Sequence, residues 1–299
     1  MRHAVLGAGG IGGLLGAALA NAGSDVVLLM RPATLARYDG RLHVESVVLG
    51  DFEVDIPAVS ALEESVDVLW VTTKATELEP ALELAPPDRV GGATVVPLMN
   101  GVDHMALLRA RYANVVAGAI RVESERLGPG RIRQSSPFLR VELGGEPSVA
   151  AELERAGITC EIREDEVTLL WEKLAFLAPI ALATTALDAP LGGVRDDERF
   201  KGCQADAIAV ALAEGARIDE GALRGLVAAA PADLRSSMQK DVAAGRRPEL
   251  DAIAGPVQRG GRRHGIPVPS TDALAHEIEA RARGFGSVHS LDSERPCGT

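Results

Sequence analysis

Three glycines near the start of the chain are spaced as they are in turns that bind a diphosphate. Gly7, Gly9 and Gly12 follow a strand-like segment, residues 2–6, and precede an Ala- and Leu-rich run, residues 11–22. They would therefore join a buried strand to a helix. The first glycine would allow a sharp bend, the second a close approach of the backbone to a ligand, and the third tight packing of the helix on the sheet. The helix start would then face the diphosphate of a dinucleotide, although the same spacing also occurs in purely structural turns.

The residue after the second predicted strand, residues 25–30, indicates which dinucleotide would bind. Sites for NAD usually carry Asp or Glu here to bind the ribose 2′-hydroxyl, whereas this chain has Arg31. A guanidinium can pair with a 2′-phosphate, so the sequence favours NADPH over NADH. The alternative is an arginine that is merely solvated at a strand end.

Two more polar residues follow predicted strands. Lys74 comes directly after residues 66–73, and Asn100 comes directly after residues 94–99. The carboxyl ends of parallel strands meet at one edge of a sheet, where folds of this type bind their ligands. We therefore expect both side chains near the glycine turn.

A lysine in the second half of the chain falls on the apolar face of a predicted helix, residues 165–187. Lys173 shares that face with Leu169, Leu170 and Ile180, which recur at three- and four-residue spacing. An ammonium group among apolar side chains loses hydration, which suits a proton donor. The alternative is a lysine whose stem is buried and whose head reaches solvent or a neighbouring glutamate.

Glu249 follows Pro248 at the predicted start of a later helix, residues 249–264. A carboxylate in the first turn of a helix usually serves only as an electrostatic cap. By position alone, Glu249 is therefore a cap.

The order of these elements predicts an α/β fold with a Rossmann-type, doubly wound parallel sheet, and a second, all-helical domain. Strands and helices alternate as far as residue 163, and only helical periodicities follow. We predict an NADP-binding domain over residues 1–163 and a helical domain for substrate binding and dimerisation over residues 164–299, ending in a polar tail from residue 284. Within the first domain, residues 42–56 and 123–134 are expected to form hairpins, and residues 115–120 to continue the parallel sheet.

Composition excludes several classes of partner. The formal net charge of −11 argues against nucleic acid and against an acidic membrane surface. The three cysteines, Cys160, Cys203 and Cys297, are far apart and predict reduced thiols with no metal site.

The first strand begins at residue 2, and the longest apolar run, residues 174–187, is short for a membrane span. We therefore expect a soluble, cytoplasmic protein that acts on a small molecule.

Taken together, these motifs resemble those of the ketopantoate reductase family, which comprises NADPH-dependent 2-dehydropantoate 2-reductases of pantothenate biosynthesis and their relatives. The resemblance covers nearly the whole chain and implies a Rossmann domain, a helical domain and an active site in the cleft between them. The matching segments, in order, are residues 7–12, Arg31, residues 71–75 and 98–101, residues 171–174, residues 236–238 with Asp241, Glu249, and residues 264–269.

The resemblance also implies a role for each site residue. Lys173 would be the general acid that protonates the substrate carbonyl, and Glu249 would bind substrate or orient Lys173. Ser237 would bind the substrate carboxylate, and Lys74 and Asn100 would contact both substrate and cofactor. The cofactor would be NADP(H), held by Gly7, Gly9, Gly10, Ile11, Gly12, Arg31, Lys74 and Asn100. A homodimer is expected.

The chain departs from the family where substrate would bind. Asparagines usual in the family four and eight residues after the lysine are replaced by Leu177 and Ala181, and another is replaced by Leu234. The only polar residues nearby on that face of the helix are Thr184 and Thr185, one turn further on. Pro179 removes one helix hydrogen bond and is expected to bend the helix.

These departures leave two alternatives to ketopantoate reduction. One is an enzyme of the same family that reduces a more apolar ketone or an imine. The other is a sensor that binds NADP without catalysis, against which the retention of both Lys173 and Glu249 argues.

Overall fold

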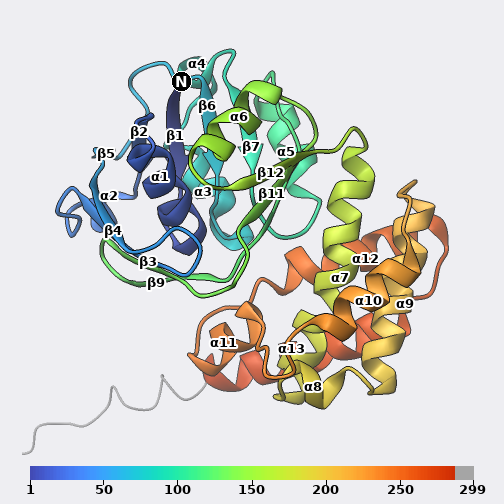
Figure 1. Cartoon of the computed structure of the whole chain (residues 1–299). Helices are drawn as coiled ribbons and strands as arrows, with labels where there is room; N and C mark the ends of the chain where they lie inside the picture. Colours follow the sequence, from blue (N-terminus) through green and yellow to red (C-terminus); the bar gives the residue numbers. More distant parts are fainter. Residues whose placement is uncertain (287–299) are drawn as a thin grey trace, which may run out of the picture. The chain divides into compact units, whose positions relative to one another are not determined.

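The computed structural model describes the backbone of residues 1–286 and the side chains of residues 1–282. Its contacts divide the chain into two compact units, Met1–Leu170 and Trp171–Thr299 (Figure 1). The division falls within the helix α7 (Glu166–Leu187). The predicted tail lies outside the described residues from residue 287, and residues 284–286 end the last helix.

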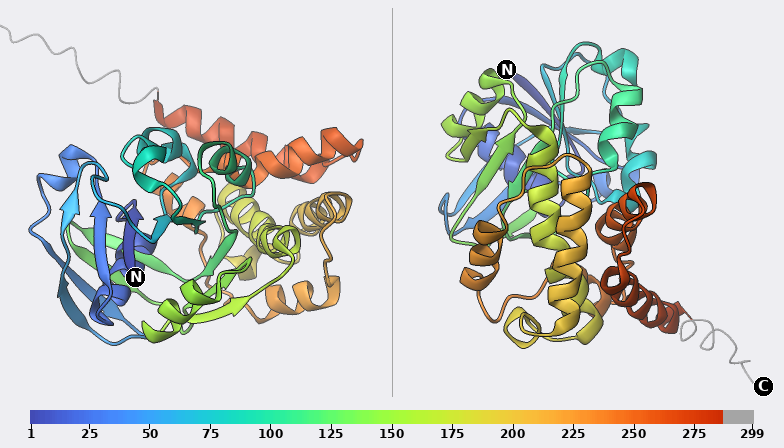
Figure 2. Two further views of the ribbon diagram at one scale, coloured as in Figure 1. Left: turned by 90° about the horizontal axis from the view of Figure 1, so that it is seen from above. Right: turned by 90° about the vertical axis from the view of Figure 1, so that its right-hand side faces the viewer.

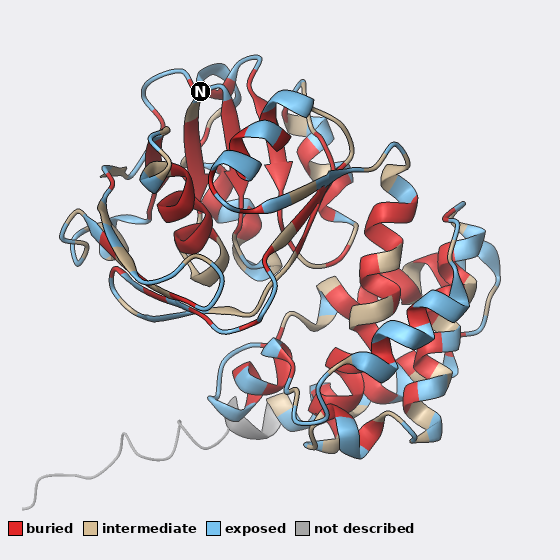
Figure 3. Cartoon of the chain, in the orientation of Figure 1, coloured by how far each residue is buried: buried red, intermediate tan, exposed pale blue. Residues whose placement is uncertain are grey.

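The first unit contains the predicted parallel sheet. Five strands lie in the order β5-β2-β1-β6-β7, and every neighbouring pair is parallel. In chain order the strands are β1 (Arg2–Leu6), β2 (Asp25–Leu29), β5 (Ala58–Val59), β6 (Val68–Val71) and β7 (Thr94–Pro97). The three strands β1, β6 and β7 are almost entirely buried (Figure 3), as expected for a sheet covered on both faces.

Alternate residues of β1 enter different apolar clusters on the two faces of this sheet. Val5 packs with Leu14 and Leu15 of α1 (Gly10–Asn21), whereas Leu6 packs with Leu78 and Leu82 of α3 (Leu78–Leu82). The predicted doubly wound architecture is therefore confirmed. The other helices of this unit are α2 (Pro32–Leu35), η1 (Ala75–Glu77, a 3-10 helix), α4 (Pro87–Val90), α5 (His104–Arg111) and α6 (Pro147–Arg155). The sequence patterns did not predict α4 or α5.

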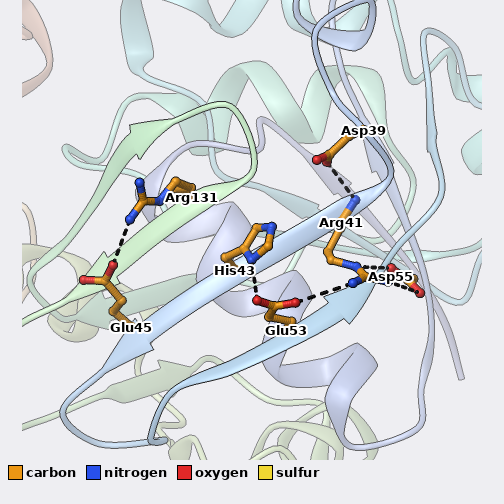
Figure 4. Close-up of polar contacts among 7 residues, drawn as sticks. All are labelled: Asp39, Arg41, His43, Glu45, Glu53, Asp55 and Arg131. Carbon is orange, nitrogen blue, oxygen red and sulfur yellow. Dashed lines mark hydrogen bonds and ion pairs between the residues drawn. The ribbon is translucent and has the colours of Figure 1, made fainter.

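Both predicted hairpins form, and together they make a second sheet in the order β4-β3-β10-β9. The strands are β3 (Arg41–Ser46), β4 (Phe52–Asp55), β9 (Ser124–Gly128) and β10 (Arg131–Gln134), and β10 joins β3 in parallel. One face carries a row of ion pairs, among them Arg41 with Asp55 and Arg131 with Glu45 (Figure 4). These pairs are half-exposed, so they contribute little to stability.

The prediction that residues 115–120 continue the parallel sheet was wrong. Val115 makes only an isolated bridge to Val95, and the following strand β8 (Gly118–Arg121) pairs antiparallel with β11 (Arg140–Leu143), which in turn pairs with β12 (Thr159–Ile162). A Cβ at Gly118 would lie 2.9 Å from the carbonyl oxygen of Pro97, so the chain passes close to the end of β7 before it joins the third sheet. The residue pattern predicts the strand correctly but not its partner.

The second unit is helical, as predicted: residues 171–286 contain no strand, and Figure 2 shows them as helices joined by loops. After α7 come α8 (Leu191–Val194), α9 (Glu198–Ala213), α10 (Glu220–Ala229), α11 (Ser237–Ala243), α12 (Leu250–His264) and α13 (Pro269–Gly286). The helices α9, α12 and α13 pack on one another. The helix α7 is long and apolar enough to cross a membrane, but 78% of its most apolar window is buried, which is the pattern of a core helix.

Candidate active site

The parallel sheet brings the predicted cofactor residues to one edge. The last paired residues of β1, β2 and β6 are Leu6, Leu29 and Val71, and Val71 is paired with Pro97 of β7. Because all these strands run in the same direction, the segments that follow them leave the sheet at its carboxyl edge. Those segments carry the glycine turn, Arg31, Lys74 and Asn100, in agreement with the expected placement.

The glycine turn has the geometry that the spacing predicts. Gly7 has a φ of +99°, a conformation that residues with a side chain rarely adopt. A Cβ at Gly12 would lie 2.2 Å from the carbonyl oxygen of Gly7, so only glycine lets α1 lie this close to the sheet. A Cβ at Gly9, in contrast, would have no protein atom within 4 Å.

These features fit a diphosphate. Gly9 occupies the N-cap position of α1 and no side chain caps the helix. The amides of Gly10, Ile11 and Gly12 therefore have no acceptor within the helix, and they carry the partial positive charge of the helix start. With open space beside Gly9, a phosphate group can approach these amides as closely as a hydrogen bond requires.

Two hydroxyl groups that the sequence reasoning missed hold this turn in place. The Thr72 hydroxyl lies 2.8 Å from the carbonyl oxygen of Gly7 and 3.0 Å from that of Leu6. The Ser124 hydroxyl donates to the carbonyl oxygen of Gly10 at 2.8 Å. Thr72 could have been found from its position at the end of β6, but Ser124 lies 114 residues from Gly10 and has no signal in the sequence.

The Arg31 side chain forms an ion pair, so it is not merely solvated. Its Nη1 atom donates to Oε2 of Glu77 at 2.5 Å, and the two side chains are 63% and 46% exposed. No acidic residue adjoins Arg31 along the chain, and the fold supplies one from the end of η1. Lys74, which precedes the same 3-10 helix, is exposed, and Asn100 is half-buried.

Lys173 lies in the second unit, in the part of α7 that follows Leu170. Lys173 is buried, with 8% of the residue exposed, and Leu169 and Leu174 of the same helix are buried as well. This exposure is far below that of a lysine whose head reaches solvent. The predicted burial of Lys173 is therefore confirmed, although α7 is buried around most of its circumference and Leu177 of the predicted face is only half-buried.

Glu249 and Ser237 also lie in the second unit, each at the start of a helix. Glu249 occupies the N-cap position of α12 and is half-buried, but its side chain makes no capping hydrogen bond. Ser237 is the first residue of α11 and is exposed. The cap of α11 is the preceding Ser236, whose hydroxyl accepts from the amide of Gln239 at 3.1 Å.

The two threonines that could have replaced the missing asparagines are both turned inward. Thr184 donates to the carbonyl oxygen of Ile180 at 2.7 Å and lies 2.8 Å from the hydroxyl of Ser236. Thr185 donates to the carbonyl oxygen of Ala181 at 2.6 Å. Both residues are at most 2% exposed, and both donate their hydroxyl protons to carbonyl oxygens of the same helix. The helix α7 continues through Pro179 to Leu187.

Comparison with known proteins matches both parts of the chain to one family. Two family models match, "Ketopantoate reductase PanE/ApbA" over residues 3–148 and its C-terminal counterpart over residues 167–282. The 2-dehydropantoate 2-reductase of Caulobacter vibrioides is 31% identical, over 93% of this chain and 98% of the relative.

Two solved structures have the same fold. A PanE/ApbA family ketopantoate reductase from Ralstonia eutropha superposes with a TM-score of 0.86 at 27% identity, covering 96% of this chain and 100% of that one. D-mandelate dehydrogenase, solved with NADH and anilino(oxo)acetate, also gives a TM-score of 0.86 with the same coverage, at 21% identity. The fold is therefore shared by enzymes with different substrates.

Proposed function

The chain belongs to the ketopantoate reductase family, and on that premise we propose that it is an NADPH-dependent oxidoreductase that reduces a 2-oxo acid to a 2-hydroxy acid. The observation that carries the proposal is the open glycine turn at the carboxyl edge of the sheet, with Arg31, Lys74 and Asn100 on the neighbouring segments. The first substrate to test is 2-dehydropantoate (ketopantoate).

The residues of the first unit would hold the cofactor. The amides of Gly10, Ile11 and Gly12 would bind the diphosphate, Arg31 would pair with the 2′-phosphate, and Asn100 would bind the ribose on the reacting side. When bound, the reduced nicotinamide supplies the hydride that converts a carbonyl group into an alcohol.

The residues of the second unit would handle the substrate and the proton. Lys173 would donate a proton from its Nζ atom to the carbonyl oxygen as that oxygen gains negative charge. Glu249 would bind the substrate or orient Lys173, and its side chain does not cap α12. Ser237, exposed at the start of α11, would bind the substrate carboxylate.

A more apolar substrate is the second candidate, and the inward-turned hydroxyls of α7 favour it. Leu177 and Ala181 offer no hydrogen bond, and Thr184 and Thr185 are occupied by the helix itself. A substrate hydroxyl buried without a partner costs about 1–3 kcal/mol. The structure of D-mandelate dehydrogenase, which has the same fold, contains anilino(oxo)acetate, so the fold does not decide between a hydroxylated and an apolar side chain.

The test compares ketopantoate with trimethylpyruvate, which lacks only the terminal hydroxyl group. NADPH oxidation is followed for both, and the values of kcat/KM are compared. If ketopantoate is preferred by about tenfold or more, the proposed loss of its hydroxyl partners is wrong. If trimethylpyruvate is reduced as well or better, the apolar alternative stands. Tight NADPH binding without turnover of any 2-oxo acid or neutral ketone would instead indicate a sensor.

A further inference from the structure

A carboxylate lies against the arginine that is proposed to bind the 2′-phosphate. Glu77 ends the 3-10 helix that follows β6, and Arg31 follows β2. In the sheet, β2 and β6 are the two neighbours of β1, so the ion pair joins the segments on either side of the strand that leads into the glycine turn. The pair therefore lies beside the expected cofactor site.

Both members of the pair are accessible to a ligand. Arg31 is 63% exposed and Glu77 46% exposed, and ion pairs between exposed groups are weak. A ligand can therefore approach Arg31, but it meets Glu77 at the same place.

NADPH and NADH differ only in the group at the ribose 2′ position, which would lie beside Arg31 and Glu77. A 2′-phosphate carries about −1.5 to −2 charges, so it must compete with Glu77 for Arg31 and is repelled by the carboxylate. A ribose 2′-hydroxyl is neutral and can donate a hydrogen bond to a carboxylate, as it does to the acidic residue of NAD sites. Glu77 thus opposes NADPH and accommodates NADH.

We propose that Glu77 is a specificity-determining residue that restrains the preference of Arg31 for NADPH and allows the site to accept NADH. The proposal rests on the proposed function, because it needs a dinucleotide at the glycine turn. Glu77 supplies, from η1, the acidic group whose absence directly after β2 was the reason to favour NADPH over NADH.

The experiment measures dissociation constants of NADPH and NADH by fluorescence titration, without substrate. In Glu77→Gln, NADPH should bind about tenfold more tightly, which is the scale of one removed like charge at short range, while NADH should bind equally or more weakly. In an Arg31→Ala background the gain from Glu77→Gln should be smaller, because competition for Arg31 is gone and only the direct repulsion between the carboxylate and the 2′-phosphate remains.

The matched control is Glu79→Gln, which removes the same charge two residues further on, at an exposed position in the first turn of α3. It should leave the ratio of the two dissociation constants within about twofold of the original. The proposal is overturned if Glu77→Gln leaves this ratio unchanged, or if Glu79→Gln changes it equally. If neither cofactor binds the unmodified protein, it is the proposed function that fails.

Discussion

Replacement of single glycines in the turn tests the cofactor site directly, because the structure assigns opposite effects to neighbouring positions. Gly9 has a φ of −82°, which alanine adopts without strain, and its Cβ would meet no protein atom within 4 Å. Gly9→Ala should therefore keep or raise stability, by about 0.4–1 kcal/mol, because it reduces the freedom of the unfolded chain. The new methyl group would occupy the space through which the diphosphate reaches the helix amides.

The expected loss of affinity follows from the cost of an extra methyl group in a filled site. Overpacking costs about 1–3 kcal/mol, which corresponds to a roughly 5- to 150-fold weaker dissociation constant for NADPH. Gly12→Ala should behave differently. Its Cβ would lie 2.2 Å from the carbonyl oxygen of Gly7 and 2.3 Å from the hydroxyl of Thr72, so α1 must move away from the sheet. We expect a destabilisation of about 1–3 kcal/mol or more.

The assay combines calorimetric titration with NADPH and denaturant unfolding of the same variants. The control is Gly92→Ala, since Gly92 also has open space around its Cβ but precedes β7 and so lies at the opposite edge of the sheet. The reasoning is refuted if Gly9→Ala binds NADPH as tightly as the control variant. Equal stability of Gly9→Ala and Gly12→Ala would refute the close approach of α1 to the sheet.

Three further predictions concern charge and protonation. Lys173→Met keeps the buried volume and should lower turnover at least about 100-fold while NADPH binding stays intact; unchanged turnover would leave Lys173 a structural residue. Arg31→Ala should weaken NADPH about tenfold or more and NADH little, and an equal loss for both would exclude a 2′-phosphate contact. Burial lowers the pKa of His3 below its usual 6.5, and its Nδ1 atom accepts from Trp70 at 3.2 Å. Just below pH 6.5 only the unfolded state protonates the His3 imidazole. The free energy of unfolding should therefore decrease as the pH is lowered through this range, by at most about 1.4 kcal/mol per pH unit, and the decrease should be smaller in His3→Gln.

The sequence by itself determined the features that depend on neighbouring residues along the chain. The spacing of Gly7, Gly9 and Gly12 is a local requirement of one turn, and apolar runs of the right length identify the buried strands of the parallel sheet. Since parallel strands end at a common edge, the positions of Lys74 and Asn100 followed without knowledge of the full fold. The helical periodicity predicted that Lys173 is buried, and the structure agrees.

Only the tertiary structure decided what lies opposite these residues. Glu77 is 46 positions from Arg31, and Ser236 is 52 positions from Thr184. Whether such side chains meet depends on strand order and on the direction of each side chain, and neither is encoded in the local pattern. For the same reason the strand at residues 118–121 was predictable but its sheet was not. The contacts of Arg31 with Glu77 and of Thr184 with Ser236 therefore come from long-range packing, whereas the glycine turn comes from the sequence of a few consecutive residues.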